Sequence, residues 1–138
     1  MPRILITSLF LFNFCIVCAQ TNDTATLSVI LVNCSSAQGK VLVSVHNDST
    51  FYDKKPPFWA EKTAKTGVLS FTFKLATNTP YAVMVLHDEN ENYQMDFNRL
   101  GLPKEEAANS GKRNKYGPPR FELAKFELKK DSLIRLQF

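Results

Sequence analysis

Oxygen-bearing side chains recur at alternate positions in the segment HDENENYQMDFN, residues 87–98. Positions 1, 3, 5 and 9 of a loop that starts at its first aspartate are Asp88, Asn90, Asn92 and Asp96. In loop-type calcium sites these positions supply carboxylate or amide oxygens, and position 7, here Gln94, supplies a backbone carbonyl. The spacing therefore predicts a calcium site with Asp88, Asn90, Asn92, Gln94 and Asp96 as ligands.

Two other positions of the same loop depart from the calcium pattern. Tyr93 stands where glycine usually makes the sharp turn, and Arg99 stands where a glutamate usually closes the shell. Glu105 or Glu106 downstream is the candidate for a closing carboxylate, and the expected affinity is weak, roughly 10⁻⁴ to 10⁻³ M as in extracellular calcium modules. The alternative is a polar turn whose Asn and Asp side chains accept hydrogen bonds from their own backbone.

Catalytic residue types are present, but their spacing argues against an enzyme. His87 and Asp88 are neighbours, and neighbours in a strand point to opposite faces, so they form a dyad only if the strand breaks there. Ser110 and Cys34 are nucleophiles by residue type alone, and the chain has no nucleophile elbow, phosphate loop or zinc signature. We expect a non-catalytic protein, and a secreted hydrolase that uses His87 and Asp88 is the alternative.

The elements that must position this loop are strands. Alternating or continuous apolar residues, rich in β-branched types, predict strands over residues 26–33, 40–47, 67–75, 81–86 and 132–138. The first two are joined by a short loop containing glycine, which predicts a hairpin. The run 81–86 is apolar on both faces, as in a central strand.

Three further regions are less regular. Apolar pairs with an offset over residues 121–130 favour a strand with a bulge slightly over a helix. A further strand is expected near Phe51 or Trp59, in a segment whose aromatic side chains either form a ligand platform or close an open end of the fold. These aromatic residues are Phe51, Tyr52, Phe58 and Trp59. With the polar stretch 88–119 as one long loop, the pattern predicts an all-β protein, a single antiparallel β-sandwich of about seven strands.

The first twenty residues have the layout of a secretory signal peptide, with Arg3 before an apolar run and Ala19 near its end. We therefore divide the chain into a signal peptide, 1–20, and a sandwich domain, 21–138. Export leads to the periplasm, to an association with the outer membrane or to secretion, and it leaves no transmembrane segment in the mature chain. Cys34 is then the only remaining cysteine, either a buried small side chain or a thiol free to bridge two chains.

The charge balance is mildly basic, +4 from 17 Lys and Arg against 13 Asp and Glu. Basic residues concentrate in GKRNKYG, 111–117, which we interpret as a solvated loop and not as a nucleic-acid site. The expected partner is a protein or a cell-surface ligand of unknown identity.

Several short motifs follow one another in the second half of the chain. They are Tyr81-Ala82-Val83, the His-Asp-x-Asn-x-Asn loop with Asp96 and Asn98, GLPKE at 101–105, and Pro119-x-Phe121 before Ala124 and Phe126. In this order the chain resembles, over residues 27–138, the uncharacterised bacterial secreted family catalogued as domain of unknown function 2141 (DUF2141). The resemblance implies an exported transthyretin-like or immunoglobulin-like sandwich with no assigned activity. The family usually has glycine where this chain has Tyr93, and a Gly-Phe-Ser-Asn pattern of which only Ser110 remains here, which implies a weaker grip on any cation.

Overall fold

The computed structural model describes residues 23–53, 56–114 and 117–138. Eight strands lie within these ranges, together with one 3-10 turn and one short helix. In chain order they are β1 Thr24–Cys34, β2 Lys40–His46, η1 Asp48–Thr50, β3 Phe58–Thr63, β4 Gly67–Ala76, β5 Thr79–Asp88, β6 Ala107–Asn109, α1 Phe121–Ala124, β7 Phe126–Leu128 and β8 Ser132–Gln137.

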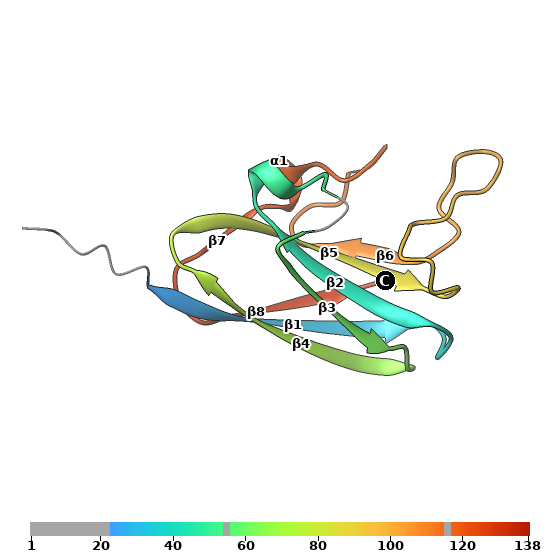
Figure 1. Cartoon of the computed structure of the whole chain (residues 1–138), viewed down its shortest axis with the longest axis horizontal. Helices are drawn as coiled ribbons and strands as arrows, with labels where there is room; N and C mark the ends of the chain where they lie inside the picture. The colour runs from blue at the N-terminus through green and yellow to red at the C-terminus, as the bar shows by residue number, and fades with distance from the viewer. Residues whose placement is uncertain (1–22, 54–55, 115–116) are drawn as a thin grey trace, which may run out of the picture.

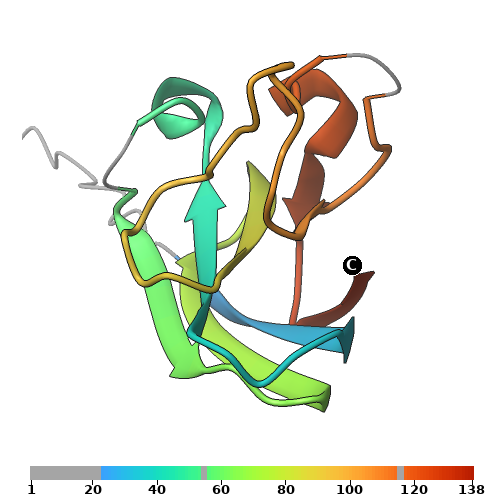
Figure 2. The same cartoon turned by 90° about the vertical axis from the view of Figure 1, so that its right-hand side faces the viewer.

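The strands form two sheets that pack face to face (Figures 1 and 2). One sheet has the order β4-β1-β8, and the other has the order β3-β2-β5-β6, with β7 paired to one end of β5. All but one of the strand pairs are antiparallel. The predicted all-β sandwich of about seven strands is confirmed, and β5 is the central strand that its apolar run predicted.

The core lies between the two sheets and follows the period of two in the sequence. Val41, Val43 and Val45 of β2 are fully buried, as are Leu27 and Val29 of β1. Their neighbours along each strand face outward and are more exposed. Because alternate side chains point to opposite faces of a strand, one face of each sheet supplies the core and the other faces outward.

One prediction about strand pairing is wrong. The first two strands do not form a hairpin, because β1 pairs with β4 and β8 while β2 pairs with β3 and β5. The connection between them, residues 35–39, crosses from one sheet to the other, and Asn33 near the end of β1 has a left-handed conformation at φ 61°. Within this mainly antiparallel sandwich, β8 lies parallel to β1.

The segment 121–130 is a helical turn followed by a short strand, where the sequence favoured one bulged strand. Phe121 and Ala124 are both buried and lie three residues apart, on the same side of the turn. They pack with Phe51 and Ala82 in a small apolar cluster on the outer side of β5. This cluster covers one end of the outer sheet face, where Figure 1 shows α1 above the strands.

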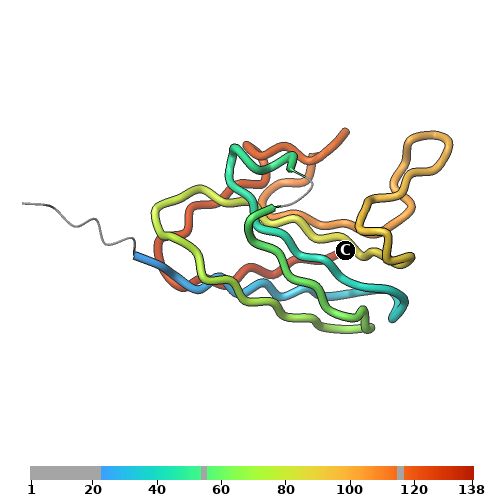
Figure 3. Tube along the Cα trace, viewed as in Figure 1, coloured from blue at the N-terminus to red at the C-terminus, as the bar shows by residue number. Residues whose placement is uncertain are grey.

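The predicted signal peptide, 1–20, lies outside the described residues and stays a prediction. Lys115 and Tyr116 of the basic loop also lie outside the described residues. In the part of the chain that is described, no helix is long and apolar enough to cross a membrane. The long loop after β5 stands clear of the two sheets, as the trace in Figure 3 shows (gold to orange).

Candidate functional site

The outer face of the β3-β2-β5-β6 sheet carries a row of side chains that face away from the core. Ser44 of β2 lies opposite Trp59 of β3 on one side and Met84 of β5 on the other. Leu42 and Leu86 form the next pair along the same two strands. Because paired residues of neighbouring strands point to the same face, these side chains form one continuous surface with an apolar floor.

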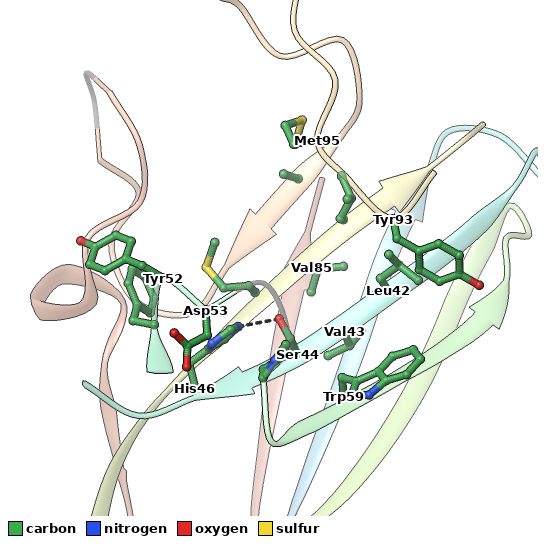
Figure 4. Close-up of a pocket in the computed structure, with 15 residues that line it drawn as sticks. Leu42, Val43, Ser44, His46, Tyr52, Asp53, Trp59, Val85, Tyr93 and Met95 are labelled. Atoms are coloured by element: carbon green, nitrogen blue, oxygen red, sulfur yellow. Dashed lines mark hydrogen bonds between the residues drawn. The ribbon is translucent and has the colours of Figure 1, made fainter. Parts of the chain in front are cut away.

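This surface is the floor of a groove of about 690 Å³, which we call the outer groove (Figure 4). Tyr52, Asp53 and Pro56 border one end, and Tyr93 and Met95 of the long loop border the other. Its lining also includes His46, Phe51 and Ala107. The side chains of Trp59 and Tyr93 are 55% and 53% exposed, so two aromatic rings are available to a ligand.

His46 is buried at the polar end of the outer groove, and its two ring nitrogens have different partners. Nδ1 lies 2.7 Å from the carbonyl oxygen of Thr50, and Nε2 lies 2.8 Å from Oγ of Ser44. A carbonyl only accepts, so Nδ1 carries the proton of the neutral ring and Nε2 accepts a hydrogen bond from the Ser44 hydroxyl. Burial lowers the pKa of His46, which favours this neutral form, although the Thr50 carbonyl and the charge of Asp53 act in the opposite direction.

The side chain of Tyr93, which borders one end of the outer groove, is held in place by Lys40 at the start of β2. The ammonium of Lys40 donates to the Tyr93 hydroxyl at 2.9 Å and to Glu61 at 3.1 Å, and it lies 3.4 Å from a carboxylate oxygen of Glu91. These two hydrogen bonds, that to Tyr93 first, raise the pKa of Lys40. Tyr93 itself has a φ of 60°. The position where the family usually has glycine is therefore a left-handed one, which a tyrosine adopts only at some cost.

Asp88, the first residue of the predicted calcium loop, is fully buried. Its Oδ1 accepts a hydrogen bond from the backbone N–H of Asn92 at 3.1 Å, and its Oδ2 accepts one from that of Tyr93 at 2.7 Å. Gly39 packs directly on the backbone at this point, where a β-carbon would collide with the Asp88 carbonyl oxygen. Asp88 therefore anchors the loop to the end of the sheet.

The other predicted ligands face one another within the same loop. The side-chain amides of Asn90 and Asn92 both donate to the carboxylate of Asp96. The side-chain oxygen of Asn90 accepts from the backbone N–H of Asn92, and that of Asn92 accepts from the backbone N–H of Gln94 at 2.8 Å. The structure thus brings the side chains of Asn90, Asn92 and Asp96 together, and it occupies them with the hydrogen bonds of a polar turn.

Glu105 closes the base of this loop. It is buried, and its two carboxylate oxygens accept from the backbone N–H groups of Glu89 and Asp96, each at 3.1 Å. Of the two glutamates considered from the sequence, Glu105 faces the loop, whereas Glu106 lies near His87. Among the described residues, no three His, Cys, Asp or Glu side chains form a group arranged to hold a metal ion.

His87 and Asp88 point to opposite faces of β5 and have separate partners. The His87 ring is fully buried on the core side, with Nε2 at 2.9 Å from the Gln38 carbonyl oxygen and Nδ1 at 3.4 Å from a carboxylate oxygen of Glu106. Cys34 lies beside it, with Sγ 3.8 Å from His87 Nδ1. Cys34 is buried, and this burial raises the pKa of its thiol.

Ser110, the other nucleophile considered from the sequence, has a structural role. Its hydroxyl accepts from the backbone N–H of Val83 at 2.8 Å and donates to the carbonyl of Ala124 at 2.7 Å. Its side chain is 1% exposed, so it joins β5 to α1 and has no contact with solvent.

The profile of a bacterial family described as "Uncharacterized protein conserved in bacteria (DUF2141)" matches residues 29–135. The chain belongs to this family. The resemblance found from the short motifs is therefore confirmed. No curated protein matches the chain, and no solved structure matches it. Membership of DUF2141 assigns no activity, so the function has to be inferred from the geometry of the site.

Sequence reasoning found part of the outer groove. The aromatic residues expected to form a ligand platform or to close an open end of the fold differ in exposure. Phe51 is buried against Phe121, with 5.5 Å between ring centroids, whereas Tyr52 and Trp59 are exposed at the groove. The apolar floor of the outer groove was not predicted from the sequence. Leu42 and Met84 alternate with core valines and provide a weak signal, namely apolar side chains on both faces of a strand.

Proposed function

We propose that this domain is an exported, non-catalytic binding module that holds its ligand in the outer groove. The observation that carries the proposal is the combination of an apolar floor with two exposed aromatic side chains. Ligand sites are usually concave and mainly apolar, with a few polar groups that fix orientation. A groove of about 690 Å³ has the size of a small-molecule or short-chain site.

The polar end of the groove favours a particular kind of ligand. The Ser44 hydroxyl donates its hydrogen bond to His46, so its oxygen still has lone pairs that can accept from a ligand. Asp53 adds an exposed carboxylate at the same end. Both groups accept hydrogen bonds. The matching ligand has an apolar, preferably flat body that lies on Trp59 and a head group that donates hydrogen bonds, such as a hydroxyl or an ammonium.

Calcium has a supporting part in this proposal. The ion would be held by Asp88, Asn90, Asn92 and Asp96 with the Gln94 carbonyl, and it would stiffen the loop that presents Tyr93. Carboxylate and amide oxygens are the donors that calcium prefers. Binding has to displace the side-chain amides that now donate to Asp96, which is a physical reason to expect weak affinity.

A titration followed by amide chemical shifts tests the proposal. The probe is 2-phenylethylamine, which has a flat apolar body and an ammonium head, and phenylacetate is the matched probe with the opposite charge. We expect shifts concentrated in β2, β3 and β5 with the amine and weaker ones with the acid. Trp59→Ala should weaken binding, whereas Leu133→Ala on the opposite sheet should not. Equal shifts in the parent and Trp59→Ala would overturn the assignment of the groove.

A hydrolase is the second candidate, because Ser44 and His46 have the separation of a nucleophile and its base. Catalysis also needs N–H donors for the developing oxyanion. β2 is an inner strand paired on both sides, so its backbone N–H groups near Ser44 are used by the sheet. Turnover of p-nitrophenyl acetate that is lost in Ser44→Ala would favour the hydrolase over the binding module.

A further inference from the structure

The long loop ends in a turn that exposes an unusual amount of apolar surface. Phe97, Leu100 and Leu102 are 59%, 84% and 57% exposed, and they lie within six residues of one another. Arg99 and Lys104 are the only charged residues between positions 97 and 104. We call residues 97–104 the loop tip. In Figure 1 this part of the loop (orange) projects beyond the ends of the strands.

The backbone of the loop tip is held by its own hydrogen bonds. The side-chain oxygen of Asn98 accepts from the N–H groups of Leu100 and Leu102, at 2.9 and 3.0 Å. The N–H of Asn98 donates to the Leu102 carbonyl, and that of Gly101 donates to the Asn98 carbonyl. Four N–H groups of the turn are therefore satisfied without water. This matters because an unsatisfied backbone group is costly in an apolar environment.

The charges of the loop tip have one sign on its outer side. Neither Arg99 nor Lys104 forms an ion pair within the described part of the chain. Asp96 and Glu105 flank the loop tip, and both direct their carboxylates back into the loop. The carboxylate of Asp96 accepts from side-chain amides. That of Glu105 accepts from backbone N–H groups. Both charged side chains of the loop tip are thus positive and exposed.

We propose that the loop tip docks this domain onto an anionic lipid bilayer. Phe97, Leu100 and Leu102 enter the boundary between head groups and acyl chains, while Arg99 and Lys104 contact lipid phosphates. Apolar side chains together with basic residues are the combination that binds anionic membranes peripherally. A protein partner is less suited to this turn, since a stable interface uses roughly 20 to 30 residues on each side.

Co-sedimentation with lipid vesicles tests this proposal without reference to the groove ligand. Vesicles of phosphatidylcholine with phosphatidylglycerol are compared with vesicles of phosphatidylcholine alone. We expect the full-length mature chain to sediment with the first and much less with the second, and to be released by high salt because screening weakens the contacts of the basic residues. The pair Arg99→Gln and Lys104→Gln should weaken binding to the anionic vesicles about 30-fold, at about tenfold per 1.4 kcal/mol.

The apolar contacts are tested by Leu100→Ser with Leu102→Ser, which should weaken binding about tenfold or more. Leu133→Ser is the matched control, because Leu133 is 61% exposed on β8 of the opposite sheet. All variants should keep the thermal midpoint of the parent, since the altered side chains are exposed. Absence of sedimentation with the anionic vesicles, or equal sedimentation of the parent and the two loop-tip pairs, would overturn the proposal.

Discussion

Replacing Asp88 by alanine removes the anchor of the long loop, and the cost follows from its hydrogen bonds. The carboxylate is fully buried and accepts from two backbone N–H groups, those of Asn92 and Tyr93. A hydrogen bond to a charged group contributes about 1.5 to 3 kcal/mol. Both donors belong to exposed loop residues that water can reach in the variant, so we take the lower end, about 3 kcal/mol for the pair.

Thermal unfolding followed by circular dichroism measures this loss. For a domain of this size, about 3 kcal/mol corresponds to a midpoint lowered by about 12 °C. Asp48→Ala is the matched control, because Asp48 is an exposed aspartate of η1, and its midpoint should change little. A shift of less than about 4 °C in Asp88→Ala would refute the assignment of Asp88 as the anchor.

The same assay separates calcium binding from a polar turn. With an affinity of about 1 mM, about 10 mM calcium should stabilise the parent by about 1.4 kcal/mol, or roughly 6 °C. The double variant Asp88→Ala, Asp96→Ala should show no calcium effect, and magnesium should have little effect on the parent. Equal midpoints with and without calcium would contradict the calcium site and leave the hydrogen-bond argument intact.

Three other side chains give independent predictions. Ser110→Ala leaves a buried N–H and a buried C=O without a partner and should cost about 2 to 4 kcal/mol in urea unfolding, whereas Ser49→Ala at an exposed hydroxyl should cost less than about 0.5 kcal/mol. The pKa of His46 in the folded chain is below its unfolded value of 6.5. As the pH falls, His46 is therefore protonated in the unfolded chain before it is protonated in the folded chain. The stability that its neutral form contributes is complete above that pH and declines as the pH falls, and His46→Gln should reduce the loss between about pH 7.5 and about pH 5. Cys34 should react slowly with Ellman's reagent in the folded chain and rapidly in guanidinium chloride, because its thiol is buried and protonated; rapid reaction of the folded chain would contradict this.

The strands could be predicted from the sequence because their alternation is local. Val41, Val43 and Val45 are sufficient to define β2 and its buried face. The partner of a strand is not a local property. The loop 35–39 looks the same whether the chain turns back along one sheet or crosses to the other, and the parallel pairing of β8 with β1 joins segments about a hundred residues apart.

The contacts within the long loop could be predicted and the groove could not, for the same reason. Asp88 and Asn92 are close in sequence, so their spacing alone indicates that they meet. The floor of the outer groove needs Trp59, Ser44 and Met84 in one row, and that row exists only once the register of three strands is fixed. A slip of one residue would turn each of these side chains to the other face.

Tyr93 belongs both to the long loop and to the lining of the outer groove. Its backbone N–H is held by Asp88, and its ring borders the outer groove. A ligand that requires the ring in place and an ion that requires Asp88 in place would favour the same loop conformation. Thermodynamic linkage then demands reciprocity, so calcium should raise the affinity of the groove for its ligand by the same factor by which the ligand raises the affinity of the loop for calcium.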